Sequence, residues 1–138
     1  MPSALAIVVA AAASNDFYVL NADGTVAFFG SGREQAQTVT LPSSTCFLAV
    51  LASDNYGPAA ILVETSTGVV TDASWKCSAE NQRYWYEPWF DDSSWSNARI
   101  VATNGDGGWH AAGISTQAKW IWADVTTLGS IYCRKTLC

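Results

Sequence analysis

Hydrophobic and polar positions alternate along this chain in short runs, with the two-residue period of β-strands. The runs are rich in Val, Ile, Thr and aromatic residues, and Gly, Pro, Asn and Asp interrupt them. The pattern predicts strands over residues 5–12, 16–20, 26–29, 37–41, 46–53, 60–65, 68–71, 99–101, 119–122 and 130–137. No segment of helical length combines a 3.6-residue period with a cap, and the nearest candidate is the short stretch 91–97.

Turn signals between the runs indicate how the strands are connected. "NADG" (21–24) separates two apolar runs and predicts a hairpin, because Asp and Gly tolerate positive φ angles. Many short strands with turns about every 8–12 residues are typical of sandwiches and jelly rolls. The sequence therefore predicts an all-β fold, a jelly-roll β-sandwich of two antiparallel sheets. With 138 residues and no linker or repeat, we expect 1–138 to form one domain.

The N-terminal run "ALAIVVAAAAS" is similar to the apolar core of a secretory signal. Residues 1–3 carry no positive side chain, so we expect the run to belong to the folded domain. At about ten residues it is too short to span a bilayer. Because 4–13 is apolar on both alternating faces, two interpretations stay open: a central strand of its own domain, or a strand packed into a neighbouring copy.

Composition and charge narrow the classes of function. The chain is 49% apolar and only 14% charged, which is typical of a globular domain. Its formal net charge is −5. Nucleic-acid binding needs clustered Lys and Arg, and attachment to anionic membranes needs the same. We therefore expect neither nucleic-acid binding nor membrane insertion.

The four cysteines, Cys46, Cys77, Cys133 and Cys138, indicate the compartment. None forms a CxxC pair, and the single histidine, His110, does not complete a zinc site of the usual spacing. An even number of cysteines without a metal pattern favours two disulfides in an oxidising environment. The sequence thus predicts an extracellular or cell-surface protein, while spacing leaves all three disulfide pairings open.

Groups suited to catalysis are few. Asp91 and Asp92 are adjacent, and adjacent strand residues point to opposite faces, so they cannot aim both carboxylates at one bond. We interpret them as a cap for the following "SSW" turn rather than as an acid/base pair, a cation site or a sugar-gripping pair. His110 has no evident orienting partner, and there is no G-x-S-x-G motif. We expect no enzyme activity.

Loops that combine aromatic and polar groups are the remaining candidates. "NGDGG" and "NADG" offer oxygen atoms but lack the twelve-residue calcium loop, so we expect no cofactor and leave a structural calcium ion open. Seven tryptophans are many for this length, and exposed Trp often marks a binding surface. Loops 53–58, 84–89 and 104–110 offer rings for stacking on sugars and polar groups for hydrogen bonds. The candidate glycan-binding residues are Asp54, Asn55, Trp85, Trp89, Asp106 and Trp109.

Six stretches follow one another in a recognisable order. "AIVVAAAASNDFYVLNADGTVAFFGSG" and "CFLAVLASDNYGPAAILVE" are followed by "DASWKCS", "FDDSSWSNA", "AKWIWA" and "IYCRKTL". Together they resemble the galactose-binding-like β-sandwich modules, which occur beside sugar-processing enzymes such as α-L-rhamnosidases and in extracellular multidomain proteins. The resemblance covers most of the chain. In the modules beside enzymes, the "WIW…YxRK" strand commonly precedes the hairpin, whereas here it closes the chain, as in a rotated unit.

The resemblance implies a jelly-roll sandwich without catalysis, often with sugar binding. It implies that "FDDSSW" (90–95) is a turn before a strand, with its Trp packed in the core. It also favours a Cys77–Cys133 disulfide, because "WKCS" and "IYCRK" look like partners in these modules, and this leaves Cys46–Cys138.

The sequence therefore predicts a secreted, non-catalytic, lectin-like module that binds glycans. The alternative is a self-associating structural protomer of an extracellular assembly or filament. In that hypothesis 4–13 packs into a neighbour, and the last strand of one copy leads into the first strand of the next.

Overall fold

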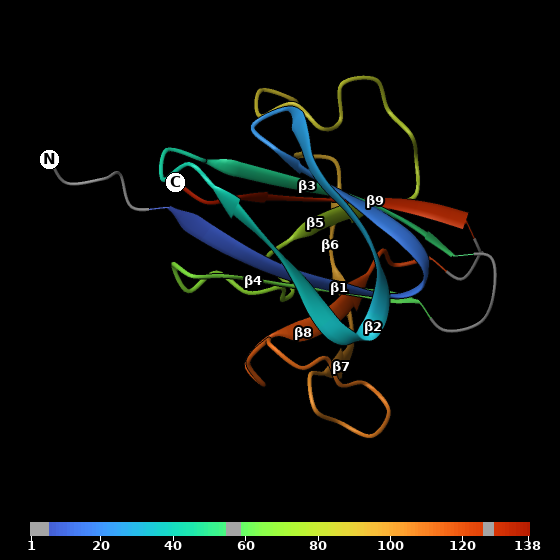
Figure 1. The fold of residues 1–138 in the computed structure, drawn as a ribbon. Coiled ribbons are helices and arrows are strands. Elements are labelled where there is room, and N and C mark those ends of the chain that lie inside the picture. Colours follow the sequence, from blue (N-terminus) through green and yellow to red (C-terminus); the bar gives the residue numbers. More distant parts are fainter. Residues whose placement is uncertain (1–5, 55–58, 126–128) are drawn as a thin grey trace, which may run out of the picture.

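The computed structural model describes residues 6–54, 59–125 and 129–138, apart from the side chains of 14–16 and 32–34. These residues form strands and no helix (Figure 1). The strands are β1 (Ile7–Ala22), β2 (Thr25–Leu41), β3 (Phe47–Asp54), β4 (Ala60–Thr65), β5 (Lys76–Ser78), β6 (Ser96–Asn97), β7 (Arg99–Thr103), β8 (Lys119–Trp122) and β9 (Gly129–Thr136).

The strands are arranged in two layers, and every pairing between named strands is antiparallel. One layer, the β3 layer, has the order β6-β5-β9-β3-β1, and the other, the β4 layer, has the order β1-β4-β8-β7. Strand β1 belongs to both, because its residues 9–14 pair with β4 and its residues 17–22 pair with β3. Strand β2 follows β1 through both layers as an edge (Figure 1). The prediction of an all-β sandwich of antiparallel sheets is confirmed.

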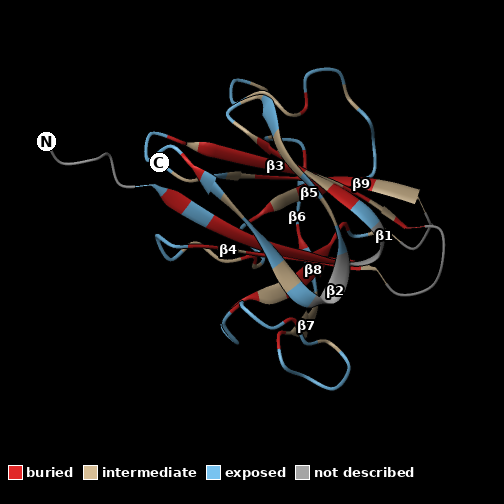
Figure 2. Ribbon diagram, in the orientation of Figure 1, coloured by how far each residue is buried: buried red, intermediate tan, exposed pale blue. Residues whose placement is uncertain are grey.

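The core lies between the two layers. Because strand side chains alternate, each layer sends one set inward. Figure 2 shows the buried positions concentrated in the central strands and the exposed ones mainly in turns, loops and the edge strand β2. The inward set includes Val9, Leu20, Leu48, Val50, Ile61, Trp75, Ile121 and Ile131, each at most 1% exposed.

The outward faces of both layers are also partly covered. Segment 79–95 lies over the outer face of the β3 layer, and segment 104–118 lies over that of the β4 layer, at the top and bottom of Figure 1. Each segment encloses its own small apolar cluster against the sheet. The molecule therefore has two covering loops on opposite sides, which we name the aromatic loop (79–95) and the glycine-rich loop (104–118).

Local sequence explains the connections. At the predicted hairpin, Asp23 and Gly24 both have positive φ angles, 49° and 89°, and Ala22 pairs with Thr25, which confirms the turn. On each side of the turn, the two strands that the sequence predicts are joined into one long strand, β1 before the turn and β2 after it. Irregularities in the register of β1 and β2 let this pair bend without separating.

Other predicted elements differ from the structure. The range 68–71 is not a strand: Val70 forms an isolated bridge with Glu64, and Thr71 is hydrogen-bonded to Val63 and Lys119. Strands β5 and β6 were not predicted, because two or three residues are too few to show a period. The range 91–97 contains turns rather than a helix.

The N-terminal run has the environment of a central strand. Over 9–13, β1 is hydrogen-bonded to β2 on one edge and to β4 on the other. Pairing on both edges gives residues 9–13 the environment of a central strand of their own domain, which is the first of the two interpretations. The self-association hypothesis stays a prediction.

Two disulfides join the β3 layer, and both predicted pairings are confirmed. Cys77–Cys133 connects β5 to β9, and Cys46–Cys138 connects the start of β3 to the residues after β9. They close chain segments of 56 and 92 residues. In the chain-entropy account each loop closure stabilises the fold by about 4–5 kcal/mol.

Candidate functional site

The aromatic loop is built from successive tight turns. In each turn a backbone N–H donates to the carbonyl three residues earlier: Trp85 to Gln82, Glu87 to Tyr84, Phe90 to Glu87 and Trp95 to Asp92, at 2.9–3.2 Å. Asn, Pro, Asp and Ser residues along 81–94 favour such turns. The loop consequently has a compact backbone although it contains no helix or strand.

One side of the loop faces the sheet and is apolar. Trp85 and Trp95 are buried there together with Phe47, Ala49 and Tyr132 of the β3 layer. The rings of Trp85 and Tyr132 meet edge to face, with centroids 4.9 Å apart. These two tryptophans bind the loop to the sheet by apolar burial.

A buried cation fixes the loop backbone. Arg134 of β9 is only 3% exposed and points outward from the sheet into the loop. Its Nη1 donates to the carbonyls of Trp85 and Glu87, its Nη2 donates to the carbonyl of Phe90 at 3.0 Å, and its Nε donates to Asp92 at 2.8 Å. One guanidinium thus binds four loop residues, as its planar set of five N–H donors allows.

Aromatic rings enclose the same guanidinium. Its central carbon lies 4.3 Å from the ring centroid of Phe47 and 5.1 Å from that of Phe90. Opening the loop would break all four contacts of the guanidinium with loop residues at once, and hydrogen bonds of a charged donor are stronger than neutral ones. The loop and Arg134 therefore form one structural unit.

The adjacent aspartates have two different roles. Asp91 accepts the Ser93 N–H at 3.0 Å, and this backbone hydrogen bond, followed by that of the Ser93 side chain, lowers the pKa of Asp91. The capping prediction is confirmed for Asp91. Asp92 instead pairs with Arg134, 42 residues away, which the local sequence did not reveal. Trp95 is buried, as the resemblance implied.

The other side of the loop presents aromatic rings to solvent. Trp89 is 65% exposed and Tyr84 is 41% exposed, with ring centroids 5.4 Å apart. The Arg83 guanidinium lies 4.9 Å from the centroid of the Tyr84 ring. Glu87 accepts the indole N–H of Trp89 at 3.0 Å. We name Arg83, Tyr84, Glu87 and Trp89 the aromatic platform.

The platform is held in a fixed position on the sandwich. Glu87 packs so closely on the β1–β2 hairpin that a Cβ at Gly24 would overlap its carboxylate. Tyr84 has a positive φ of 64°, an uncommon conformation for a non-glycine residue. The main-chain carbonyls that flank the rings are bound by Arg134. The rings are therefore presented by a constrained backbone.

The predicted ligand residues on this loop occupy different environments. Trp89 lies on the platform, while Trp85 lies beneath it at 7% exposure and packs against the sheet. The sequence prediction did not name Arg83, Tyr84 and Glu87. The signal that could have found them is the density of aromatic residues interspersed with Arg83, Glu87 and Pro88 in "RYWYEPW".

Three other predicted ligand residues lie on other parts of the fold. Asp54 is buried at the end of β3, and Asn55 lies outside the described residues. Asp106 and Trp109 belong to the glycine-rich loop on the opposite layer, where Trp109 is half-buried and its ring lies 5.5 Å from that of Trp120. The structure therefore does not bring the predicted residues that it describes into one site.

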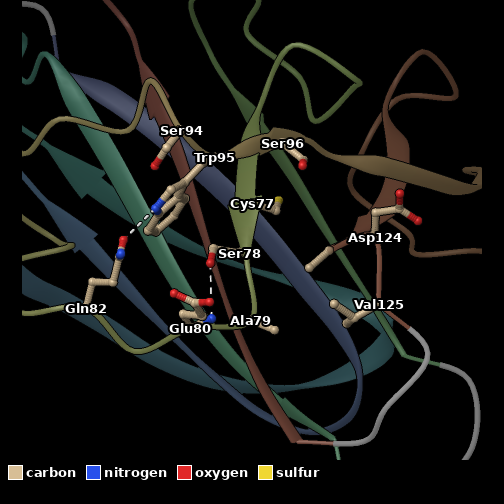
Figure 3. Close-up of a pocket in the computed structure, with 11 residues that line it drawn as sticks. Cys77, Ser78, Ala79, Glu80, Gln82, Ser94, Trp95, Ser96, Asp124 and Val125 are labelled. Atoms are coloured by element: carbon tan, nitrogen blue, oxygen red, sulfur yellow. Dashed lines mark hydrogen bonds between the residues drawn. The ribbon is translucent and has the colours of Figure 1, made fainter.

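A pocket lies at the base of the aromatic loop. Its volume is about 370 Å³, and it is bounded by β5, the first residues of the loop, the turn before β6 and the segment after β8 (Figure 3). Trp95 forms one wall, and its indole N–H donates to Gln82 Oε1 at 2.7 Å. Glu80 and Asp124 line opposite sides of the pocket in this view.

In the described part of the chain, no three His, Cys, Asp or Glu side chains gather where they could hold a metal ion. Within it, there is also no long apolar helix that could cross a membrane.

Comparisons of this chain with protein-family models, with curated proteins and with solved structures find no match. The galactose-binding-like resemblance and the jelly-roll topology therefore stay predictions from the sequence. The β-sandwich and its two disulfides stand on the structure alone.

Proposed function

We propose that this protein is a non-catalytic module that binds carbohydrate at the aromatic platform. The observation that carries the proposal is Trp89, whose ring is 65% exposed on a loop fastened by a buried arginine. Neighbouring exposed rings with a polar rim are a common form of ligand-binding surface. Two disulfides fit an extracellular location, which belongs to the same proposal.

The chemistry of the platform suits a pyranose ring. The apolar C–H face of a sugar stacks on Trp89 and Tyr84, while Arg83 donates hydrogen bonds to hydroxyl oxygens and Glu87 accepts them from hydroxyl groups. The side chains are already placed, so binding immobilises few rotamers. A shallow platform of this kind gives dissociation constants in the millimolar to micromolar range, roughly −4 to −8 kcal/mol.

A sugar titration with paired variants tests this proposal. A panel of neutral oligosaccharides is titrated into the ¹⁵N-labelled protein, and amide and indole shifts are followed. Trp89→Ala and Tyr84→Ala should each weaken binding by about tenfold or more, by loss of stacking. Phe29→Ala is the control, since Phe29 is 70% exposed on β2 and outside the platform. Saturable binding that survives Trp89→Ala, or no binding to any sugar of the panel, contradicts the proposal.

A second candidate function is self-association, and one observation favours it. Phe17 and Phe29 are 46% and 70% exposed, and the register places both on the outward face of β1 and β2, with Val19 opposite Phe29. Contiguous exposed apolar residues often mark protein interfaces. Sedimentation at rising protein concentration tests this: Phe29→Ser should abolish any oligomer, and a wild-type monomer at every concentration removes the candidate.

A further inference from the structure

The two disulfides differ in their access to solvent. Cys77 and Cys133 are 3% and 0% exposed, so the bond between them is enclosed by the protein. Cys46 is half-buried and Cys138 is exposed. Thiol–disulfide exchange begins when a thiolate reaches one of the two sulfur atoms, so an accessible disulfide reacts first. A reductant should therefore open Cys46–Cys138 while Cys77–Cys133 stays closed.

The accessible disulfide lies at a junction with the β1–β2 hairpin. The backbone N–H of Cys46 donates to Oδ1 of Asp23 at 3.0 Å, and the N–H of Asp23 donates to the carbonyl of Phe47 at 3.0 Å. The N–H of Leu137, beside Cys138, donates to the carbonyl of Cys46 at 2.7 Å. The bond thus closes a junction between the hairpin, the start of β3 and the residues that follow β9.

The same hairpin supports the aromatic platform. Gly24, next to Asp23, lies against the carboxylate of Glu87. Oε2 of this carboxylate accepts the indole N–H of Trp89 at 3.0 Å. A continuous series of contacts therefore runs from the disulfide through the hairpin and Glu87 to the exposed ring of Trp89.

The β3 layer keeps its main connections without this bond. Strands β3 and β9 pair along their whole lengths, Phe47–Asp54 with Gly129–Thr136, and Cys77–Cys133 joins β9 to β5. The accessible disulfide lies at the end of the β3–β9 pair, and local opening of the native state starts most easily at such ends. Its reduction should loosen the junction rather than unfold the sandwich.

We propose that Cys46–Cys138 is a reducible disulfide that controls the position of the aromatic platform. A small dithiol supplies both electrons. Its first thiolate attacks Sγ of Cys138 and expels the Cys46 thiolate, and its second thiolate then attacks the reductant's sulfur in the mixed disulfide and expels the Cys138 thiolate. The dithiol becomes a cyclic disulfide, and its two protons pass to the two cysteine sulfurs. The effect on sugar binding rests on the proposed function, whereas the effect on the platform does not.

Graded reduction tests whether the two disulfides react separately. The full-length protein is incubated with rising concentrations of dithiothreitol, free thiols are alkylated, and the modified cysteines are identified by peptide mapping. Cys46 and Cys138 should be modified at least about tenfold faster than Cys77 and Cys133, while circular dichroism keeps its strand signal. Equal rates at the two disulfides, or loss of the fold when Cys46–Cys138 opens, overturns the proposal.

The indole N–H resonance of Trp89 tests the link to the platform. Selective reduction should shift it, and Cys46→Ser combined with Cys138→Ser should reproduce the shift, while the Trp120 resonance stays in place. Asp23→Gly is the matched variant, since it removes the carboxylate but allows the positive φ of 49° at this position. Reduction of Asp23→Gly should cause little of the shift. A Trp89 resonance that does not move in the wild type, or that moves as far in Asp23→Gly, overturns the link.

Sugar binding is measured separately, so the two proposals can fail independently. For a sugar of the panel that binds the oxidised protein, the selectively reduced protein should bind about threefold more weakly or worse, because the rings are no longer fixed before binding. Unchanged affinity after selective reduction contradicts the control of the platform by this disulfide. The absence of sugar binding by the oxidised protein contradicts the proposed function alone, since the Trp89 measurement requires no sugar.

Discussion

The two covering loops perform the same structural task by different means. Each closes the outer face of one layer over a small apolar cluster. The aromatic loop is fastened by Arg134 of β9, which lies outside the loop and binds loop residues 42–49 positions earlier in the sequence. The glycine-rich loop is fastened from within by the neutral amide of Asn104, which bonds Ala111, Ile114 and Ser115 only 7–11 positions away. Contacts from outside this loop are single hydrogen bonds, such as that from the Ser115 N–H to Glu64 and that from the Ala36 N–H to the carbonyl of Ala112.

This difference corresponds to what each loop shows to solvent. Because Arg134 holds the backbone of the aromatic loop, the loop does not depend on burying all of its rings. It can therefore present a large ring to solvent, as it does with Trp89. The glycine-rich loop half-buries Trp109 and exposes glycines and Asp106. One loop thus presents exposed rings, at which we propose that sugar binds, and the other mainly covers the sheet.

The largest effect is expected from Arg134→Met. It removes the donors of four loop residues while keeping an apolar stem, so the free energy of unfolding should fall by about 4 kcal/mol. Hydrogen exchange should quicken across 79–95 and stay unchanged across 104–118. Lys135→Met is the matched control, because this neighbouring cation makes one exposed contact, with Ser74, and should cost less than about 0.5 kcal/mol. Equal losses in the two variants would mean that Arg134 is not the anchor.

Asn104→Ala should have the second largest effect. It removes an amide that is 2% exposed and leaves the Ala111 N–H without its acceptor at 2.9 Å, which costs about 2 kcal/mol of stability. Chemical denaturation measures the loss, and hydrogen exchange locates it. The exchange should now quicken in 104–118 and not in 79–95, the reverse of the Arg134 variant. Asn97→Ala, at an exposed position of β6, provides the reference.

A smaller effect is expected at the contact between the hairpin and the platform. Gly24 and Gly68 both have positive φ angles, 89° and 96°, but only Gly24 lies against Glu87, whereas Gly68 faces open space. Gly68→Ala should therefore cost only the backbone strain, about 1–2 kcal/mol, and Gly24→Ala should cost more, since Glu87 must move. The indole N–H resonance of Trp89 should shift in Gly24→Ala alone. If the Trp89 indole N–H resonance has the same chemical shift in both variants, Glu87 does not connect the hairpin to the platform.

The smallest effect is a pH dependence confined to the aromatic loop. The hydrogen bonds from Ser93 lower the folded-state pKa of Asp91 below its usual value of 3.8. A group whose pKa is lower in the folded state stabilises the fold at pH values above its unfolded-state pKa. This stabilisation is lost as the pH falls through the folded-state pKa. The Ser93 amide should therefore lose protection from hydrogen exchange when the pH falls below the folded-state pKa of Asp91. Asp91→Asn should remove this pH-dependent loss of protection. The amide of Ala111, whose acceptor is the neutral Asn104, should show no such step.

The sequence was most informative where local chemistry decides the conformation. The turn at Asp23 and Gly24, the cap at Asp91 and most strands follow from neighbouring residues. The disulfide pairs were predicted through a family resemblance, since spacing alone left three choices.

The rest depends on contacts between distant segments. Nothing near Asp92 in the sequence identifies Arg134 as its partner. Likewise, Trp85 and Trp89 are both in an aromatic stretch, and only the direction in which the loop folds over β9 buries the first and exposes the second. The bend that makes β1 part of both layers is also a tertiary feature, since each half has a strand pattern of its own.

Backbone dynamics test most directly the claim that Arg134 holds the aromatic loop in a fixed position. ¹⁵N relaxation gives order parameters for 84–90 in the wild type and in Arg134→Lys, which keeps the charge but not the planar set of donors. We predict values near those of β9, about 0.85, in the wild type and clearly lower ones in the variant, with 104–118 unchanged. Order parameters below about 0.6 for 84–90 in the wild type, or no change in the variant, would contradict the account.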